Sequence, residues 1–271
     1  MTTSSLAGAP PATEADLPTR RADAWQQHPA FFPYRALAGT CAGDFPNAAR
    51  LTALAAARGV RNGLGLTAGF AAPAGTLKAA DYELRIWRTG IIPVDLSAWH
   101  DRLNALVWLA FPRFKAALNA SHARRLLADP SEARRRGRQR DALTLLDEMG
   151  LLVTGPADLL RGLAARAWHE LFVQQRERAK TEMSFTAVGH GLLEKALAPY
   201  PALTAKCLLL EAARPPSFPD LDAAAAGALA GITSPAQLPP LPICGIPGWS
   251  DANARADFYD DPAIFRPPPG G

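Results

Sequence analysis

Cysteine is scarce in this chain of 271 residues, which contains only Cys41, Cys207 and Cys244. The three are far apart and odd in number, which argues against a disulfide framework and against a zinc cluster of thiolates. Because such usage is typical of proteins kept in a reducing compartment, we expect a cytoplasmic protein.

Long apolar runs are also missing, because Arg, Asp, Pro or Gly interrupts each alanine- and leucine-rich stretch. A membrane-spanning helix is therefore not expected. Residues 1–20 have neither the basic start nor the continuous apolar core of a signal peptide, and we expect a disordered lead-in. No internal repeat or convincing linker divides the rest, so residues 21–271 are predicted to form one globular domain.

The chain lacks the short motifs that identify common catalytic sites. It contains no GxGxxG, no GxxxxGK[ST], no HExxH and no GxSxG. These absences leave no sequence support for a dinucleotide site, a P-loop, a zinc protease helix or a nucleophile elbow. No motif therefore names a reaction.

Apolar residues make up 48% of the chain, which is enough for a substantial core. Their spacing predicts an α+β fold that is predominantly α-helical, in one compact domain. Helices are expected at residues 47–59, 97–111, 112–128, 157–180, 191–198, 203–213 and 221–230, and short strands at residues 64–70 and 82–86. A short β-hairpin is expected at residues 141–154, and residues 214–271 are expected to form an extended, proline-rich wrap.

The densest candidate site lies on both sides of Pro112. His100 and Asn104 are one helical turn apart before this residue, and Asn119 and His122 are one turn apart after it. Proline breaks a helix because it lacks a backbone N–H and clashes with the preceding turn. The two polar pairs are therefore expected on two separate helices, with Ser97 as the N-cap of the first.

His190 lies between two glycines directly before an apolar helical stretch. Glycines let a backbone approach closely, so the ring is a candidate to close on a ligand, and the alternative is a histidine that caps the helix. Asp141, Asp147 and Glu148 lie in the predicted hairpin, and carboxylates with histidines suit a divalent metal of unknown identity. A turn role for Asp147 and Glu148 is the favoured interpretation.

The net charge of +4 is unevenly distributed, because arginines gather between residues 124 and 140. Within this region, Arg134, Arg135, Arg136 and Arg138 lie almost side by side. Closely spaced guanidinium groups bind phosphates and other polyanions, so this segment is a candidate contact for an acidic partner or nucleic acid. A solvated surface loop is the simpler interpretation.

Several strings along the chain are distinctive. They are RIWRTGIIP (85–93), WHDRLNALVWLAFPRFKAALNASH (99–122), RDALTLLDEMG (140–150), VGHGLLEKAL (188–197), LTAK (203–206), GIPGW (245–249) and FYDDPAIFRP (258–267). Together they resemble the bacterial domain-of-unknown-function family 3025, over most of residues 31–268. The resemblance implies no established activity and supplies no catalytic or ligand residues.

Two function classes follow from these residues. In the first, a soluble bacterial protein uses a polar pocket as a hydrolytic centre, with a divalent metal as its candidate cofactor. The candidate catalytic residues are His100, Asn104, His122, Asp141 and His190, and the candidate ligand-binding residues are Arg140, Trp108 and Asn119. In the second, a non-catalytic binding or scaffold protein contacts an acidic partner or nucleic acid through the arginine-rich loop.

Overall fold

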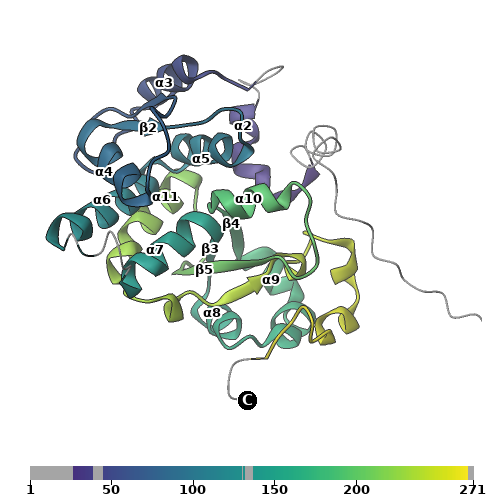
Figure 1. The fold of residues 1–271 in the computed structure, drawn as a ribbon. Helices are drawn as coiled ribbons and strands as arrows, with labels where there is room; N and C mark the ends of the chain where they lie inside the picture. Colours follow the sequence, from purple (N-terminus) through teal and green to yellow (C-terminus); the bar gives the residue numbers. More distant parts are fainter. Residues whose placement is uncertain (1–26, 39–44, 130, 132–136, 268–271) are drawn as a thin grey trace, which may run out of the picture.

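The chain has a helix-rich α+β fold, and the computed structural model describes residues 27–38, 45–129, 131 and 137–267 (Figure 1). The α-helices are α2 (Arg35–Ala38), α3 (Ala48–Ala57), α4 (Ala79–Thr89), α5 (Trp99–Ala110), α6 (Pro112–Ala128), α7 (Arg138–Met149), α8 (Ala157–Ala164), α9 (Arg176–Glu182), α10 (His190–Ala196) and α11 (Phe218–Ala228). The strands are β1 (Gly69–Ala71), β2 (Ile91–Pro93), β3 (Gly150–Gly155), β4 (Ser184–Ala187), β5 (Thr204–Glu211) and β6 (Pro240–Pro242).

Helices α5 and α6 form the interrupted segment that Pro112 predicts. Pro112 is the first residue of α6, where its missing N–H leaves no helical hydrogen bond unmade. The carboxylate of Asp222 on α11 accepts hydrogen bonds from the backbone N–H groups of Arg113 (3.0 Å) and Phe114 (2.9 Å). The break is thus stabilised by a side chain more than one hundred residues away in the sequence.

The predicted N-cap of α5 is wrong by one residue. Ala98 holds that position, and the hydroxyl of Ser97 instead donates a hydrogen bond of 2.6 Å to Asp95. The carboxylate of Asp101, in the first turn of α5, accepts a hydrogen bond from the backbone N–H of Asp95. This local network holds the chain in place before α5 without a side-chain cap on the helix itself.

A four-stranded sheet with the order β4-β3-β5-β6 forms the other half of the fold. Strand β3 is antiparallel to β4 and parallel to β5, and β5 is antiparallel to β6. All six residues of β3 are buried, as is typical of a central strand that is covered on both faces. Figure 1 shows α7 and α10 above this sheet and α8 below it.

The predicted β-hairpin at residues 141–154 is wrong. Helix α7 continues to Met149, and its buried residues Ala142, Leu143 and Leu146 lie on one face at helical spacing. The chain enters β3 directly at Gly150, where a Cβ atom would lie 2.1 Å from the backbone oxygen of Leu146. Glycine is needed here for a close approach and not for a hairpin turn.

Other predicted elements also differ from the structure. Residues 82–86 belong to helix α4, because five alternating residues do not distinguish a strand from a helix that ends at the left-handed Gly90. The predicted helix at residues 203–213 is strand β5, since pairing with β3 and β6 overrides the helical preference of Leu and Ala.

Two further predicted elements are shorter than expected. The predicted helix at residues 157–180 is interrupted after α8, near the left-handed residue Arg166, and continues through the π-helical turn η5 (Glu170–Gln174) into α9. The predicted strand at residues 64–70 is reduced to the short β1, which pairs with β2 in parallel.

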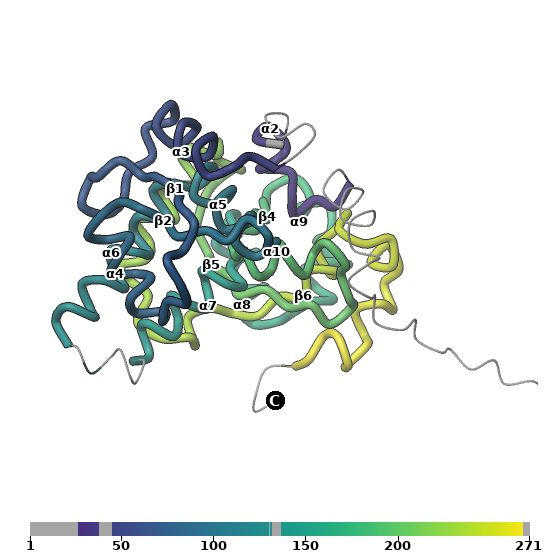
Figure 2. The backbone as a smooth tube through the Cα atoms, turned by 45° about the horizontal axis from the view of Figure 1, so that its top comes forward, coloured from purple at the N-terminus to yellow at the C-terminus, as the bar shows by residue number. Residues whose placement is uncertain are grey.

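The C-terminal segment runs over the body as short 3₁₀ turns and β6. Tyr259 and Phe265 are buried, and the Tyr259 hydroxyl donates a hydrogen bond of 2.8 Å to the carbonyl of Gly245. Figure 2 shows this segment, in yellow, on the side of the molecule opposite α4 and α6. Within the predicted wrap of residues 214–271, α11 is a regular helix. The predicted lead-in of residues 1–20 and Cys41 lie outside the described residues.

Candidate functional site

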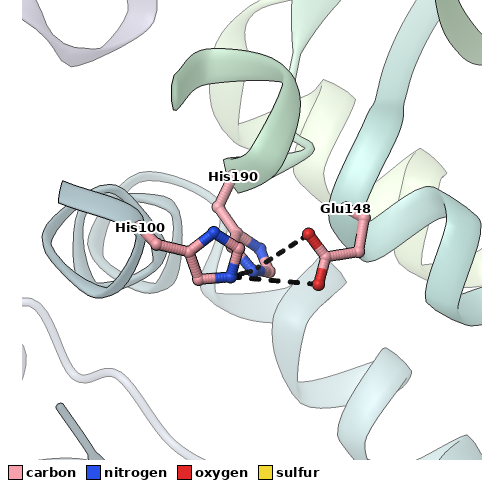
Figure 3. A group of neighbouring side chains, drawn as sticks. All are labelled: His100, Glu148 and His190. Carbon is pink, nitrogen blue, oxygen red and sulfur yellow. Dashed lines mark hydrogen bonds and ion pairs between the residues drawn. The ribbon is translucent and has the colours of Figure 1, made fainter. Parts of the chain in front are cut away.

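Two histidines and one carboxylate converge where helices α5, α7 and α10 meet. They are His100 at the start of α5, Glu148 near the end of α7 and His190 at the start of α10 (Figure 3). Each offers one ligand atom, and these three atoms lie within 4.8 Å of one another. Side chains from three separate parts of the sequence therefore form one compact donor set.

Small residues allow His190 to approach α7. A Cβ atom at Gly189 would lie 2.2 Å from the backbone nitrogen of Gly150 and 2.6 Å from the carbonyl oxygen of Glu148. A Cβ atom at Gly191 would lie 2.7 Å from the Glu148 carboxylate. The glycines on both sides of His190 thus permit a close backbone approach, which in the structure is to α7; a ligand at the His190 ring stays a prediction.

The two imidazole rings face each other through their Nε2 atoms, which are 2.9 Å apart. The carboxylate of Glu148 lies beside both atoms, 3.9 Å from His100 Nε2 and 3.6 Å from His190 Nε2. On the opposite side of each ring, Nδ1 faces another carboxylate: Glu194 lies 3.0 Å from His100 Nδ1, and Asp147 lies 3.9 Å from His190 Nδ1. Each histidine therefore lies between Glu148 and a second acidic residue.

A buried lysine holds Asp147 in place. Lys115 is 3% exposed, and its ammonium forms an ion pair with the Asp147 carboxylate. Burial by itself raises the pKa of Asp147, but the charge and hydrogen bond of Lys115 oppose this effect, and the pKa stays below its ordinary value. Asp147 is therefore ionised and stands directly behind the ring of His190.

The environment keeps His190 neutral. Burial lowers the pKa of its ring to about 3, although the charge of Asp147 acts in the opposite direction. Burial also raises the pKa of Glu148, although the neighbouring His100 opposes the shift. A neutral imidazole is the form in which histidine donates a lone pair to a metal or accepts a proton.

A cavity of about 300 Å³ opens beside these three residues. Its polar lining comes from α4 (Tyr82, Glu83), α5 (His100, Asp101, Asn104), α6 (His122), α7 (Arg140, Thr144, Asp147, Glu148) and α10 (His190). Among the described residues that line it, Asn104 Oδ1, His122 Nδ1 and His190 Nδ1 are buried atoms with no hydrogen-bond partner. Five helices thus present polar groups to one small space.

The cavity brings together most of the residues that the sequence indicates. His100, Asn104, His122, His190 and Arg140 all line it. Asp141 does not, because it lies in the first turn of α7 next to Arg140 and outside the lining. The predicted hairpin grouped Asp141 with Asp147 and Glu148, whereas in helix α7 only the latter two line the cavity.

The two remaining candidates support the helices beside the cavity. Asn119 donates hydrogen bonds to the backbone carbonyl (2.9 Å) and the carboxylate (2.7 Å) of Glu83, and so joins α6 to α4. Trp108 is buried in the core, with the Lys115 ammonium 5.6 Å from its ring centre. Neither residue is in the cavity lining.

The sequence does not identify the carboxylates of the site as functional. Asp147 and Glu148 are assigned to a turn there, although a helical pattern places them with Arg140 and Thr144 on one face. Glu194 lies one turn after His190 on α10, a spacing visible in the sequence. Nothing in the sequence indicates that Lys115 reaches Asp147.

The arginine-rich loop is mostly outside the described part of the chain. Arg134, Arg135 and Arg136 fall there, and Arg138 is exposed at the start of α7. Contact of this loop with an acidic partner or nucleic acid stays a prediction. Among the described residues, no helix combines the length and the apolar character needed to span a membrane.

Comparison with known proteins places the chain in a family. Neither the curated proteins nor the solved structures contain a match. A family model does match, over residues 70–268, and this match confirms the resemblance across that range. The matched range includes all the residues that line the cavity. The chain belongs to DUF3025, a family of proteins of unknown function.

Proposed function

We propose that this protein is a hydrolase that uses a divalent metal ion held by His100, Glu148 and His190. The observation that carries the proposal is the convergence of two imidazole Nε2 atoms and one carboxylate at the edge of a polar cavity. Two histidines with one carboxylate are a recurrent ligand set for zinc in hydrolytic sites and for non-haem iron. Magnesium and calcium prefer oxygen ligands, so zinc is the expected ion.

The protonation of the rings supports a cation between them. The Glu194 carboxylate, at hydrogen-bond distance from His100 Nδ1, favours a proton on that atom. Asp147 is too far from His190 Nδ1 for a hydrogen bond, at 3.9 Å, but its negative charge favours a proton there too. A ring protonated at Nδ1 presents a lone pair at Nε2, so two lone pairs meet across 2.9 Å. A cation that both lone pairs bind relieves this repulsion.

The distances within the donor set also suit zinc. With metal–ligand bonds of about 2.0–2.1 Å, two ligand atoms of a tetrahedral site lie about 3.3 Å apart. The two Nε2 atoms are 2.9 Å apart, and different oxygens of the Glu148 carboxylate lie 3.6 Å from His190 Nε2 and 3.9 Å from His100 Nε2, so the carboxylate would have to turn and move toward the rings before one oxygen completes the site. The carboxylates behind the rings correspond to the carboxylate–histidine–zinc pairs that orient metal ligands.

Three protein ligands leave one position of a tetrahedral zinc ion for water or substrate. Zinc lowers the pKa of a bound water to about 7 and polarises a carbonyl or phosphoryl oxygen. The neighbouring cavity of about 300 Å³ has room for a small substrate. A larger cavity of about 800 Å³ lies near Arg58 and Phe218, but no histidine is among the described residues that line it.

The test is zinc binding followed by hydrolysis. Calorimetry with the chelator-treated protein should find one zinc ion per chain. His100→Ala, Glu148→Ala and His190→Ala should each weaken zinc binding at least a hundredfold. His169→Ala changes an exposed histidine that does not line the cavity, and this variant should bind zinc as the wild type does. Wild-type zinc binding no tighter than that of the three variants would overturn the site.

The zinc-loaded protein should then be assayed with ester, amide and phosphate-ester substrates. Turnover is expected to need the metal, to disappear with chelator and to be absent in His100→Ala. If the wild type binds zinc but hydrolyses none of these substrates, the hydrolytic assignment is refuted while the metal site stands.

A further inference from the structure

We propose that Asn104 and His122 form a subsite of the cavity for a neutral, hydrogen-bonding group of the substrate, such as a carboxamide or a hydroxyl. This inference rests on the proposed function, because the rest of the same substrate would lie at the metal site of His100, Glu148 and His190. It identifies the substrate class as small, polar compounds and excludes purely aliphatic ones.

The first observation is a pair of unsatisfied polar atoms in the cavity wall. Asn104 is 6% exposed, and its amide Nδ2 donates a hydrogen bond of 2.8 Å to the Tyr82 hydroxyl, while Oδ1 has no partner. His122 is 4% exposed, and its Nδ1 has no partner among the described residues. Both side chains line the cavity, and they come from different helices.

Such atoms are uncommon because they are costly. A buried donor or acceptor without a partner costs about 1–3 kcal/mol, and most buried polar groups in folded proteins are therefore paired. Two in one cavity wall indicate that something entering the cavity completes their hydrogen bonds. A ligand group that binds there must therefore offer these hydrogen bonds.

The position of Asn104 sets the distance of this subsite from the metal site. Asn104 follows His100 by one turn of α5, and the Cβ atoms of residues four apart on a helix lie about 6 Å from each other, so side chains that extend in parallel keep about this separation. The substrate group that binds Asn104 and His122 should therefore lie about 6 Å from the substrate group that binds the metal. The cavity of about 300 Å³ holds about ten water molecules, so the whole ligand is small.

The chemistry of the wall favours a neutral group that both donates and accepts. Oδ1 of Asn104 needs a donor, and His122 Nδ1 is a donor or an acceptor according to its tautomer. A carboxamide or a hydroxyl supplies both functions, whereas an alkyl group would leave both atoms unpaired. Sites built to bind a polar group discriminate strongly against analogues that lack it.

The test uses zinc-loaded protein and three hydroxamates as metal-binding probes. One carries a primary carboxamide two methylene groups away, the second carries an isopropyl group of similar size in its place, and acetohydroxamate carries neither. The wild type should bind the carboxamide probe at least tenfold more tightly than the isopropyl probe. Asn104→Leu and His122→Leu should each remove most of this preference while leaving acetohydroxamate affinity unchanged, which shows that the metal site and the fold are intact.

A wild type without the preference, or a preference that survives both substitutions, would overturn the subsite while zinc binding stands. If the wild type binds no zinc, the proposed function fails and the subsite is tested in the metal-free protein. Glutaramide should then shift the Asn104 side-chain amide signals in an NMR spectrum, and tetramethylglutaramide, which has no N–H, should not. Equal effects of the two amides, or no effect of either, would refute the subsite.

Discussion

Replacing Lys115 with methionine is expected to destabilise the metal-free protein by about 3–4 kcal/mol at pH 7. The ammonium is buried and ion-paired with Asp147, whose side chain is itself only 19% exposed. Methionine keeps the apolar stem and removes the charge. Removing one partner of a buried ion pair costs about 3–5 kcal/mol, because the remaining charge is buried without compensation.

The stability lost in Lys115→Met has an upper limit that depends on pH, because Asp147 can take up a proton and so remove its unpaired charge. Neutralising a carboxyl with the ordinary pKa of 3.8 costs about 1.4 kcal/mol for each pH unit above that value. The limit is therefore about 4 kcal/mol at pH 7 and about 2 kcal/mol at pH 5. For the same reason, adding Asp147→Asn to Lys115→Met should recover much of the stability that is lost.

Urea unfolding in the presence of chelator measures these free energies at both pH values. Lys180→Met is the matched control, because Lys180 forms an exposed ion pair with Glu177 and such a pair contributes at most about 1 kcal/mol. The reasoning fails if Lys115→Met costs less than 1 kcal/mol at pH 7, or if the loss is as large at pH 5 as at pH 7. It also fails if the double variant is no more stable than the single one.

Two further predictions concern the histidines. Burial lowers the pKa of His190 to about 3; Lys115 and His100 add to this shift, and Asp147 opposes it. Below about pH 6.5, therefore, this histidine binds a proton in the unfolded chain but stays neutral in the native, metal-free protein. This residue should therefore reduce the free energy of unfolding by about 2 kcal/mol from pH 7 to pH 5, a loss absent in His190→Gln and present in His169→Gln. Glu194→Gln should weaken zinc binding 10–100-fold, with one ion still bound per chain, because the Glu194 carboxylate orients His100. Calorimetry measures this affinity, and an unchanged value would show that Glu194 has no such role.

The sequence predicts the fold best where a single residue limits the backbone. Pro112 predicts the break between α5 and α6. The helix expected at residues 47–59 is α3, and the structure adds that the Asn47 side chain caps it by accepting a hydrogen bond from the N–H of Arg50. Strand β5 shows the limit of such reasoning. Its leucines and alanines prefer a helix in isolation, and only pairing with β3 and β6, both distant in the sequence, makes it a strand.

The candidate site, too, could be predicted from the sequence only in part. The chain has only five histidines but 25 aspartates and glutamates, so residue type selects His100 and His190 but does not select their carboxylate partners. Helical spacing alone does not choose Glu148 over Asp141, because residues seven apart lie on nearly the same face of a helix. Only the way the other helices pack around α7 places Glu148, and not Asp141, in the cavity wall.

Even a correct α7 would not place His190 beside Glu148. That contact requires the backbone of α10 to approach α7 so closely that neither Gly189 nor Gly191 has room for a side chain. The two glycines are visible in the sequence, but they indicate only that another part of the molecule packs closely there. The structure identifies that part as the backbone and carboxylate of Glu148. A methyl group at Gly191 would therefore act on the donor set directly, because it would meet the Glu148 oxygen that faces His190.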